Sequence, residues 1–342
     1  MNILIIHTAF IGDIVLSIPV IKELKIKYPN SKIFFLTTPI NAQLLENNPN
    51  LEEVLIFDKK NRDKGLFGLI KYSSKLRKYK FDKIFVLHRY LRSSVLAYLS
   101  FPKEIIGFKS ASGSFLYTKK IDYNINLHEI DRMISLVDEG TTKNTTLKPK
   151  IEIYVPVKVI EKVDKIWNEF LLNNKIIITL APGSNWFTKM WPSYYYDKVI
   201  NMLLGIENVV IILIGSVNDS TISLENSNKT LDLRGKTTLL EMAEILKRTD
   251  ILVSNDSSPI HIGSAFDKPF IIAIFGPTTK SLGFTPSNLK NKVIEIENLD
   301  CRPCGLHGSK KCPKGHFKCM KEIYTEIIFI EIQKVIKLIK LQ

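Results

Sequence analysis

The sequence predicts an α/β protein with two doubly wound halves, each built on a parallel sheet. Short apolar runs alternate with stretches of helical periodicity, which is the pattern of βαβ units. The alternation occurs twice, on either side of a polar and aperiodic region at residues 141–150. The chain of 342 residues also exceeds the ~100–200 residues of a typical domain. We therefore expect domains at residues 1–155 and 156–321, and a final helix within residues 322–342.

The first half alternates strand and helix from its first residues. Residues 2–7 are an apolar run, and the turn Gly12-Asp13 separates them from an amphipathic stretch that Pro29 ends. The same two patterns recur along this half. The predicted strands are residues 2–7, 32–37, 54–57, 83–87 and 104–108, and the predicted helices are residues 14–28, 42–47, 66–78 and 93–99.

The second half repeats the alternation after the polar region. Its predicted strands are residues 175–180, 209–214, 251–254 and 270–275, and its predicted helices are residues 157–172, 194–204, 239–247, 258–265 and 323–341. Ligands of such sheets bind outside the carboxyl ends of the strands. The turns that follow strands are therefore the candidate sites, and two facing halves would place the ligand in the cleft between them.

Several classes of protein are excluded or disfavoured. Neither GxGxxG after the first strand nor GxxxxGK[ST] occurs, which disfavours dinucleotide dehydrogenases and P-loop NTPases. No apolar run approaches the ~20 residues of a membrane span. The N-terminus reads as a strand rather than a signal peptide, so we expect a cytoplasmic protein.

The chain is basic, with 48 Lys and Arg against 34 Asp and Glu and a net charge of +14. Such a surface suits nucleic acid, anionic lipid or a phosphorylated substrate, although a lysine-rich composition alone has the same effect. Lys59, Lys64, Arg89 and Arg92 follow predicted strands, so they are placed to meet an anionic substrate. No interleaved platform of aromatic and basic residues occurs, so we expect no nucleic-acid partner.

Asp13 is the first candidate for chemistry. It lies between the first strand and the first helix, directly after Gly12, which permits close approach of a substrate to the backbone. A carboxylate at this edge can accept a proton as general base. The alternative is that Asp13 only caps the helix.

A second candidate site follows the first strand of the second half. Gly183 and Ser184 would expose backbone N–H groups, and Lys189 would offer a point charge to a phosphate. The alternative is a surface loop with an ordinary exposed lysine.

The third candidate joins a strand to a helix. Asp256, Ser257 and Ser258 stand at the helix start, and His261 lies about one turn further. Helix N-termini bind phosphate, and the two serines would add hydroxyl donors. Simple capping by Asp256 or Ser257, with His261 in the core, is the compatible alternative.

Four cysteines lie in one short segment near the C-terminus. Cys301, Cys304, Cys312 and Cys319 are candidate ligands of a structural zinc, although only the first pair has the tight CxxC spacing. The alternative is four free thiols. Nearby lysines at residues 310, 311, 314 and 318 would lower the thiol pKa values or contact an anionic acceptor.

These segments together resemble glycosyltransferase family nine, the ADP-heptose:lipopolysaccharide heptosyltransferases. The resemblance rests on Ile-Gly-Asp-Ile-Val-Leu-Ser-Ile-Pro, on Ala-Pro-Gly-Ser before Lys-Met-Trp-Pro, on Asp-Leu-Arg-Gly-Lys-Thr-Thr-Leu and on Asn-Asp-Ser-Ser-Pro-Ile-His-Ile-Gly-Ser-Ala. Their order and spacing cover nearly the whole chain. The cysteine segment is most similar to the heptosyltransferase II branch.

The resemblance implies a GT-B fold of two Rossmann-like domains that face a central cleft. The first would bind the acceptor and the second the nucleotide sugar, with the final helix packing back toward the first. It implies inverting, metal-independent transfer from ADP-L-glycero-D-manno-heptose to the inner core of lipopolysaccharide, without a catalytic cofactor. It also suits a peripheral protein on the cytoplasmic face of the inner membrane.

Individual residues acquire roles by the same resemblance. Asp13 matches the general base, and Lys189 matches the residue that neutralises the donor diphosphate. The implied donor-binding residues are Gly183, Ser184, Lys189, Asp219, Asp256, Ser257, Ser258 and His261. The candidate acceptor-binding residues are Gly12, Lys59, Lys64, Arg89 and Arg92. The family usually has glycine where this chain has Ser258, whose Cβ would crowd a phosphate or whose hydroxyl would add a hydrogen bond.

Two other functions fit the same residues. One is a glycosyltransferase of this fold that uses another nucleotide sugar or another glycan acceptor. The other is a non-catalytic protein that binds sugar nucleotides, although a pure binder needs no base at the site of Asp13.

Overall fold

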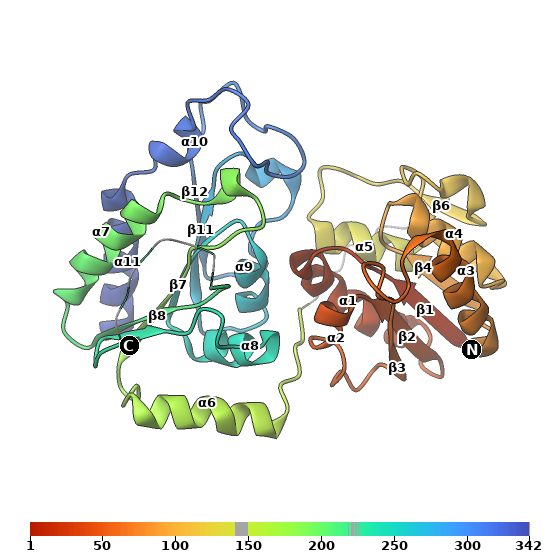
Figure 1. Ribbon diagram of the computed structural model, residues 1–342, viewed down its shortest axis with the longest axis horizontal. Coiled ribbons are helices and arrows are strands. Elements are labelled where there is room, and N and C mark those ends of the chain that lie inside the picture. Colours follow the sequence, from red (N-terminus) through yellow and green to blue (C-terminus); the bar gives the residue numbers. More distant parts are fainter. Residues whose placement is uncertain (141–149, 218, 220–221, 223, 225, 342) are drawn as a thin grey trace. The chain divides into compact units, whose positions relative to one another are not determined.

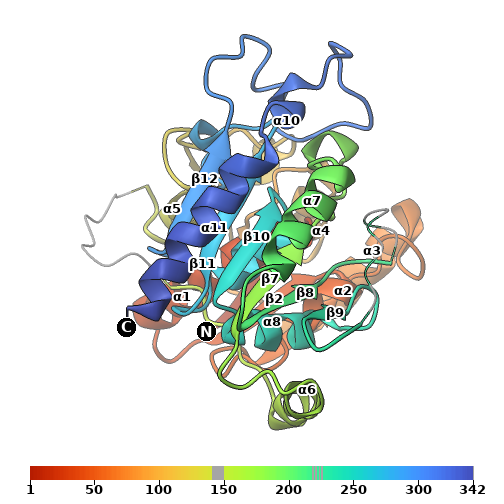
Figure 2. The same cartoon turned by 90° about the vertical axis from the view of Figure 1, so that its left-hand side faces the viewer.

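The structure is a computed structural model that describes residues 1–140, 150–217, 219, 222, 224 and 226–341. Contacts between residues divide the chain into two compact units, Met1–Tyr154 and Val155–Gln342. The division falls beside the boundary that we expected at residue 155. Each unit is a parallel sheet with helices on both faces (Figures 1 and 2).

The first unit contains a six-stranded sheet in the order β3-β2-β1-β4-β5-β6. All neighbouring strands are parallel, and Ile3 of β1 pairs with Ile33 of β2 on one side and with Lys83 of β4 on the other. The strands are β1 (Asn2–Ile6), β2 (Lys32–Thr37), β3 (Glu53–Ile56), β4 (Lys83–Val86), β5 (Glu104–Phe108) and β6 (Lys119–Ile121). This is the strand order of a Rossmann sheet. The chain adds strands on one side of β1 up to β3 and then on the other side from β4 onward, so the order reverses between β1 and β4.

The helices of this unit bury their apolar sides on the sheet. They are α1 (Ile11–Lys27), α2 (Pro39–Ala42), α3 (Gly65–Leu76), α4 (Leu91–Leu99) and α5 (Glu129–Val137). Helices α1 and α5 pack together, and so do α3 and α4. Leu69, Tyr72 and Leu76 of α3 share one core cluster with the strands, and Leu96 of α4 joins them.

The second unit contains a six-stranded parallel sheet in the order β12-β11-β10-β7-β8-β9. Counted along the chain, this is the same Rossmann order, and the reversal lies between β7 and β10. The strands are β7 (Ile176–Ala181), β8 (Val209–Leu213), β9 (Thr230–Asp232), β10 (Ile251–Asn255), β11 (Phe270–Phe275) and β12 (Asn291–Glu295). Its helices are α6 (Val157–Glu169), α7 (Ser193–Leu204), α8 (Leu239–Arg248), α9 (Ser258–Gly263), α10 (Lys318–Lys321) and α11 (Thr325–Lys340).

The C-terminal helix α11 belongs to the second unit. It packs against α7 and β11, and Ile328, Ile332 and Ile336 are buried in the core of this unit. Figure 2 shows α11 and α7 on one face of the sheet. Its packing back toward the first domain stays a prediction.

Some sequence expectations were wrong in detail. The predicted helix at residues 42–47 is replaced by the short helix α2, which starts at Pro39 and ends at Ala42. Proline at a first helical position fixes φ where no N–H is needed, so the helix starts earlier. The edge strands β6, β9 and β12 and the helix α5 were not predicted. No helix among the described residues is long and apolar enough to cross a membrane.

Candidate functional site

In the second unit, the predicted residues gather where the sheet order reverses. Gly183 and Ser184 follow β7, and Asp256 and Ser257 follow β10, the neighbouring strand. Asn255, which is fully buried, joins the two turns because its Nδ2 donates to the carbonyl of Pro182 at 2.6 Å. A crevice at such a reversal is the usual ligand site of doubly wound sheets.

Lys189 approaches the turn after β10 from a 3₁₀ turn, η3 (Phe187–Lys189). Its Nζ lies 2.6 Å from Oδ2 of Asp256, and the two side chains are 13% and 5% exposed. Oγ1 of Thr278 donates to the same carboxylate oxygen at 2.6 Å. The ammonium is therefore held in place, and it has three donors, so it can bind a phosphate while keeping Asp256. The reading of Lys189 as an ordinary exposed lysine is wrong.

The other predicted residues of this unit lie around the pair. Ser257 is the N-cap residue of α9, and its side chain makes no cap hydrogen bond. Ser258 is the first residue of the helix and is partly exposed. His261 is 4% exposed and thus buried behind the helix start.

Asp219 lies against the glycine of the β7 turn. Its Oδ2 accepts from the backbone N–H of Ser216 at 2.5 Å, and a Cβ at Gly183 would come within 2.1 Å of the same oxygen. A side chain at position 183 would therefore have to displace the Asp219 carboxylate. Burial raises the pKa of Asp219, and the Ser216 hydrogen bond and the charge of Arg234 oppose the shift.

In the first unit, the corresponding reversal lies between β1 and β4. Asp13 stands at the third position of α1, and its Oδ2 accepts from the backbone N–H of Phe10 at 3.2 Å. The carboxylate therefore does cap the helix, as the alternative reading holds. Capping uses one carboxylate oxygen and is compatible with proton transfer at the same group.

Two histidines that the sequence analysis missed lie at the reversal between β1 and β4. His7 directly follows β1, His88 follows β4, and their rings meet edge to face at 5.7 Å. Nδ1 of His88 lies 3.2 Å from Oγ1 of Thr8 and 3.2 Å from Oγ of Ser93. Their positions in the sequence could have identified them as candidate site residues, because each is the first polar side chain after an apolar strand.

Both histidines are neutral at physiological pH. Burial, followed by the charge of His88, holds the pKa of His7 well below its usual range. Burial, together with the charges of Lys59 and Arg89, lowers the pKa of His88 to about 4.

This shift predicts acid sensitivity of the fold. Because the pKa of His88 is depressed in the folded chain, its contribution to stability is complete above about pH 6.5 and is lost as the pH falls toward 4. We expect the free energy of unfolding to drop by on the order of 2–3 kcal/mol over this window. Denaturant unfolding of wild type and His88→Gln should show a smaller drop in the variant. The exposed His307→Gln is the control, and equal drops in all three proteins would contradict the assignment.

The candidate acceptor cations are only partly gathered around Asp13. Lys59 Nζ donates to the carbonyl of Thr8 at 2.6 Å, which places it at this edge. Burial and the nearby charge of Arg92 lower the pKa of Lys59. The Arg89 guanidinium lies 4.0 Å above the ring of Tyr123. Lys64 is exposed at the start of α3.

The match to known families decides which chemistry this arrangement serves. The model of glycosyltransferase family 9 (heptosyltransferase) matches residues 69–314. This chain is a member of glycosyltransferase family 9. It is therefore an enzyme of the glycosyltransferase class.

Similar proteins agree with this membership over their full lengths. Lipooligosaccharide heptosyltransferase 2 of Campylobacter jejuni subsp. jejuni serotype O:6 is 25% identical over 98% of this chain and 99% of its own. A family 9 glycosyltransferase from Veillonella parvula superposes with a TM-score of 0.84 at 22% identity, over 98% of this chain and 96% of its own. ADP-heptose LPS heptosyltransferase II of Escherichia coli gives 0.78 at 19% identity, over 99% and 100%. These structures confirm the predicted α/β fold of two Rossmann-like units, the GT-B class.

The cysteine segment of this family 9 enzyme supports the Lys189 turn. The backbone N–H and Oγ1 of Thr188 both donate to the carbonyl of Ser309 at 3.0 Å. A Cβ at Gly308 would lie 2.6 Å from Cβ of Trp186 and 2.9 Å from Cγ of Lys189. The segment is thus packed directly on the turn that carries the candidate cation.

Arg302 anchors the same segment to the sheet. Its guanidinium donates to the carbonyls of Gly276 and Ile296, and to the carbonyl of Thr278 at 2.6 Å. It also pairs with Glu295 at 2.8 Å. Since Thr278 also donates to Asp256, Arg302 is linked through Thr278 to the carboxylate that binds Lys189.

The cysteines do not form a ligand set in this structure. All four are free thiols. Sγ of Cys301 lies 3.8 Å from Nε2 of His316, but within the described residues no three His, Cys, Asp or Glu side chains are arranged to hold a metal. The structural zinc stays a prediction, which metal analysis of the purified protein would decide.

The expectation of lowered thiol pKa values was wrong where a shift is resolved. Burial raises the pKa of Cys319 to about 11, and burial together with the charges of neighbouring thiols raises the pKa of Cys304. Desolvation of the thiolate outweighs the surrounding positive charge at these two positions.

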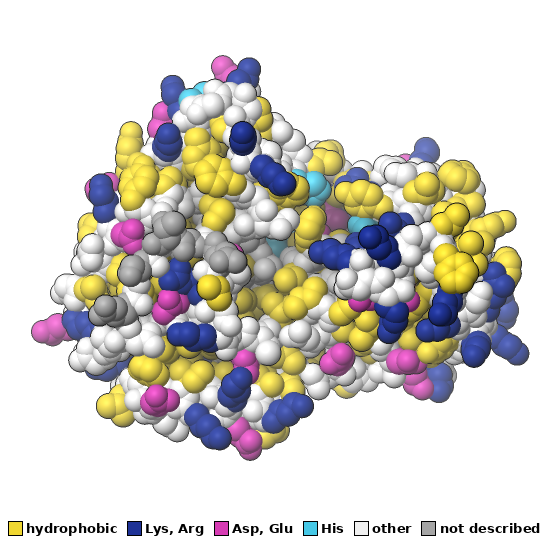
Figure 3. Space-filling view, in the orientation of Figure 1, with side chains coloured by type: hydrophobic (Ala, Val, Ile, Leu, Met, Phe, Trp, Pro, Cys, Tyr) yellow, Lys and Arg dark blue, Asp and Glu magenta, His cyan; other side chains and the backbone are white. Residues whose placement is uncertain are grey.

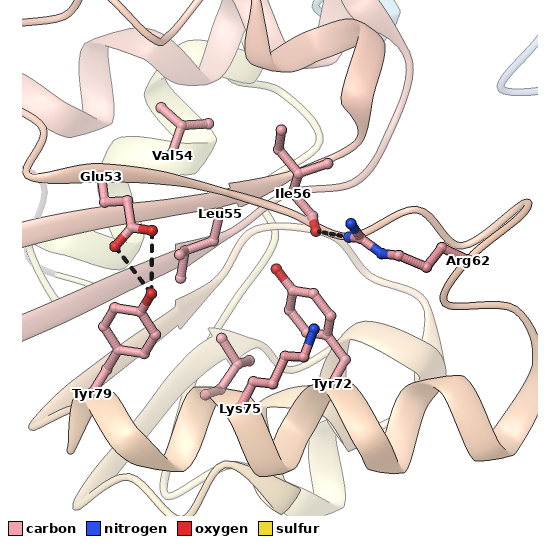
Figure 4. A pocket seen from close by; sticks show the side chains of 9 residues that line it. Glu53, Val54, Leu55, Ile56, Arg62, Tyr72, Lys75 and Tyr79 are labelled. Carbon is pink, nitrogen blue, oxygen red and sulfur yellow. Dashed lines mark hydrogen bonds between the residues drawn. The ribbon is translucent and has the colours of Figure 1, made fainter.

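One pocket contains none of the predicted site residues. It lies between β3 and α3, and Figure 4 shows Arg62, Tyr72, Lys75 and Tyr79 around it. Nη2 of Arg62 donates to the carbonyl of Ile56 at 3.0 Å. The pocket therefore flanks α3 and lies outside the turns that follow β1 and β4.

Proposed function

We propose that this chain transfers heptose from ADP-L-glycero-D-manno-heptose to the inner core of lipopolysaccharide, with inversion at the anomeric carbon. The observation that carries the proposal is the placement of Asp13 and Lys189. In a chain of family 9, each stands at the strand-order reversal of its own sheet, and Lys189 is oriented by Asp256. Similar proteins named for lipopolysaccharide heptose transfer and for ADP-heptose support the choice of donor and acceptor.

The proposed step needs one base and one cation. An acceptor hydroxyl attacks the anomeric carbon while Asp13 takes its proton. The bond between that carbon and the phosphate oxygen breaks, and ADP leaves with the electron pair. Lys189 neutralises the charge that develops on the leaving phosphate, so no catalytic metal or cofactor is required by this scheme. The reaction requires that the donor held by the second unit reach the acceptor held by the first during turnover.

The geometry refines the proposed roles on the donor side. A carboxylate repels a phosphate, and Asp256 already binds Lys189 and Thr278. We therefore assign Asp256 to positioning Lys189. The proposed donor contacts are the residues of the two turns and of the helix start, with Asp219 near the ribose: Gly183, Ser184, Asp219, Ser257, Ser258 and His261.

The proposed acceptor side comprises Gly12, next to Asp13, and candidate cations of the first unit. Lys59 is the best supported of them, because its bond to the Thr8 carbonyl keeps its ammonium at the sheet edge. The acceptor of inner-core transfer is anionic, so cations at this edge would hold it. The full proposed set is Gly12, Lys59, Lys64, Arg89 and Arg92.

The proposed setting is the cytoplasm, with the protein peripheral on the cytoplasmic face of the inner membrane. The acceptor would be the lipid A–core molecule at that face, and nucleic acid is not a proposed partner. A structural zinc held by Cys301, Cys304, Cys312 and Cys319 is part of the proposal.

A panel of nucleotides tests the donor. Calorimetric titration with ADP, UDP, GDP, CMP and ADP-heptose should show selective binding of ADP and ADP-heptose. Preferential binding of UDP or GDP would be consistent with the fold but would indicate a different nucleotide sugar as the donor. Absence of binding to every nucleotide would contradict the enzymatic role of Lys189.

A further inference from the structure

We propose that the first unit docks on an anionic lipid bilayer through the exposed face of α3 and its flanking lysines. We call this face the α3 patch: Leu66, Phe67, Ile70, Lys71, Lys75 and Lys78. The inference rests on the proposed function, because docking would bring this unit to the membrane in which the proposed acceptor is anchored.

The apolar part of the patch lies on the side of α3 that faces away from the core. Leu66, Phe67 and Ile70 are 71%, 81% and 46% exposed, whereas Leu69, Tyr72 and Leu76 are buried against the sheet. Residues three and four apart share a helix face, so Leu66 and Ile70 are neighbours and Phe67 stands beside them. Single exposed apolar residues are ordinary, but a contiguous group marks an interaction surface.

The segment that contains α3 is strongly basic, although exposed Glu53 of β3 lines the same pocket as Lys75. Between residues 59 and 80 the chain has one acidic residue, Asp63, which is 7% exposed and paired with Arg62 at 3.0 Å. The basic residues of the same segment are Lys59, Lys60, Arg62, Lys64, Lys71, Lys75, Arg77, Lys78 and Lys80. Figure 3 shows yellow and dark blue side chains together over the α3 region.

Two of the three lysines lie on one flank of the helix. Lys71 and Lys75 of α3 are four residues apart and so share one side of the helix, and Lys71 adjoins Phe67 in the same way. Lys78 lies in the 3₁₀ turn η1 (Arg77–Tyr79) that follows α3. Figure 4 shows Lys75 and Arg62 on opposite walls of the pocket between α3 and β3. The patch is therefore apolar on one side and cationic on the other, which is the composition of a helix that lies in a membrane interface.

Charge complementarity selects a bilayer of anionic lipid as the partner. Headgroup phosphates attract each nearby lysine, and the acyl region buries leucine, phenylalanine and isoleucine. Nucleic acid would use the lysines but would leave Leu66 and Ile70 in water. The patch is also continuous in sequence with Lys59, which is bound to the Thr8 carbonyl beside Asp13. A docked unit would thus present its acceptor-side residues near the membrane surface.

Vesicle binding of the full chain tests the proposal. The wild type should sediment with phosphatidylcholine vesicles that contain about one-third phosphatidylglycerol, and only weakly with pure phosphatidylcholine. Leu66→Ser/Phe67→Ser should lower the partition coefficient by roughly tenfold or more. Lys71→Gln/Lys75→Gln should lower it by about fivefold for each lysine removed. Matched controls are Leu289→Ser, at a leucine that is 93% exposed, and Lys158→Gln/Lys165→Gln on α6, and both should bind as the wild type does.

Rates of heptose transfer to two different acceptors distinguish a failure of the docking proposal from a failure of the proposed function. Leu66→Ser/Phe67→Ser should transfer heptose normally to a water-soluble, deacylated acceptor and lose most of its rate on the same acceptor in vesicles. If heptose transfer itself is wrong, no variant transfers to either acceptor, while the binding differences persist. Any of three results would overturn the docking proposal. The wild type does not bind anionic vesicles, the patch variants bind them as the wild type does, or an oligonucleotide displaces the wild type from them.

Discussion

Asp13→Asn should lower the rate of heptose transfer by about 10²–10⁴-fold, the usual contribution of a general base. The amide has nearly the same shape as the carboxylate but cannot take a proton from the acceptor hydroxyl. Its oxygen can still accept from the N–H of Phe10, which Asp13 binds at 3.2 Å. The start of α1 should therefore remain intact, and only the chemical step should fail.

Three readouts make the Asp13 test decisive. Single-turnover rates measure the chemical step, calorimetry measures ADP-heptose binding, and thermal unfolding measures stability. We expect a large loss in the first and little change in the other two, because the proposed donor residues lie in the second unit. Asp13→Ala should add a loss of stability of about 1 kcal/mol, since it also removes the cap. Normal turnover of Asp13→Asn would leave capping as the sole role of this residue.

Lys189→Met should lower the rate by roughly 10²–10³-fold, by analogy with the loss of one donor to a developing anion. Methionine keeps the apolar stem and removes the charge. The same substitution leaves Asp256, at 5% exposure, without its cation. Breaking a buried pair in this way costs about 3–5 kcal/mol of stability, so a simple loss of activity would be ambiguous.

A double variant separates the two effects of Lys189. In Lys189→Met/Asp256→Asn no unpaired carboxylate remains, and the amide can still accept from Thr278. We expect the double variant to regain much of the stability but neither the turnover nor the affinity for ADP. Recovery of turnover in the double variant would show that Lys189 acts only as a partner of Asp256.

The sequence alone was sufficient to predict the parts of the fold that depend on local pattern. The strands at residues 32–37, 104–108 and 270–275 were predicted with their observed ends, because apolar runs between turn residues admit few alternatives. The edge strand β6 has only three residues, and α5 carries buried Arg132 paired with Glu129. Such elements are stabilised by tertiary partners, so their own sequence predicts them poorly.

The candidate site was predictable only as separate turns. The strand-end rule located Asp13, Gly183 and Asp256, but the sequence could not show which turns are neighbours. Only the strand order places His88 beside His7, and only the folded second unit shows that Asp256 binds Lys189. The contacts of the cysteine segment with the Lys189 turn were likewise not predictable from its spacing, because they join residues far apart in the chain.

The most direct test of the central claim is analysis of the product. The purified chain is incubated with ADP-heptose and a deacylated inner-core acceptor, and the product is examined by mass spectrometry and NMR. The proposed function predicts a gain of one heptose, release of ADP and an anomeric configuration opposite to that of the donor. Retained configuration, or transfer only from a UDP or GDP sugar, would contradict the claim.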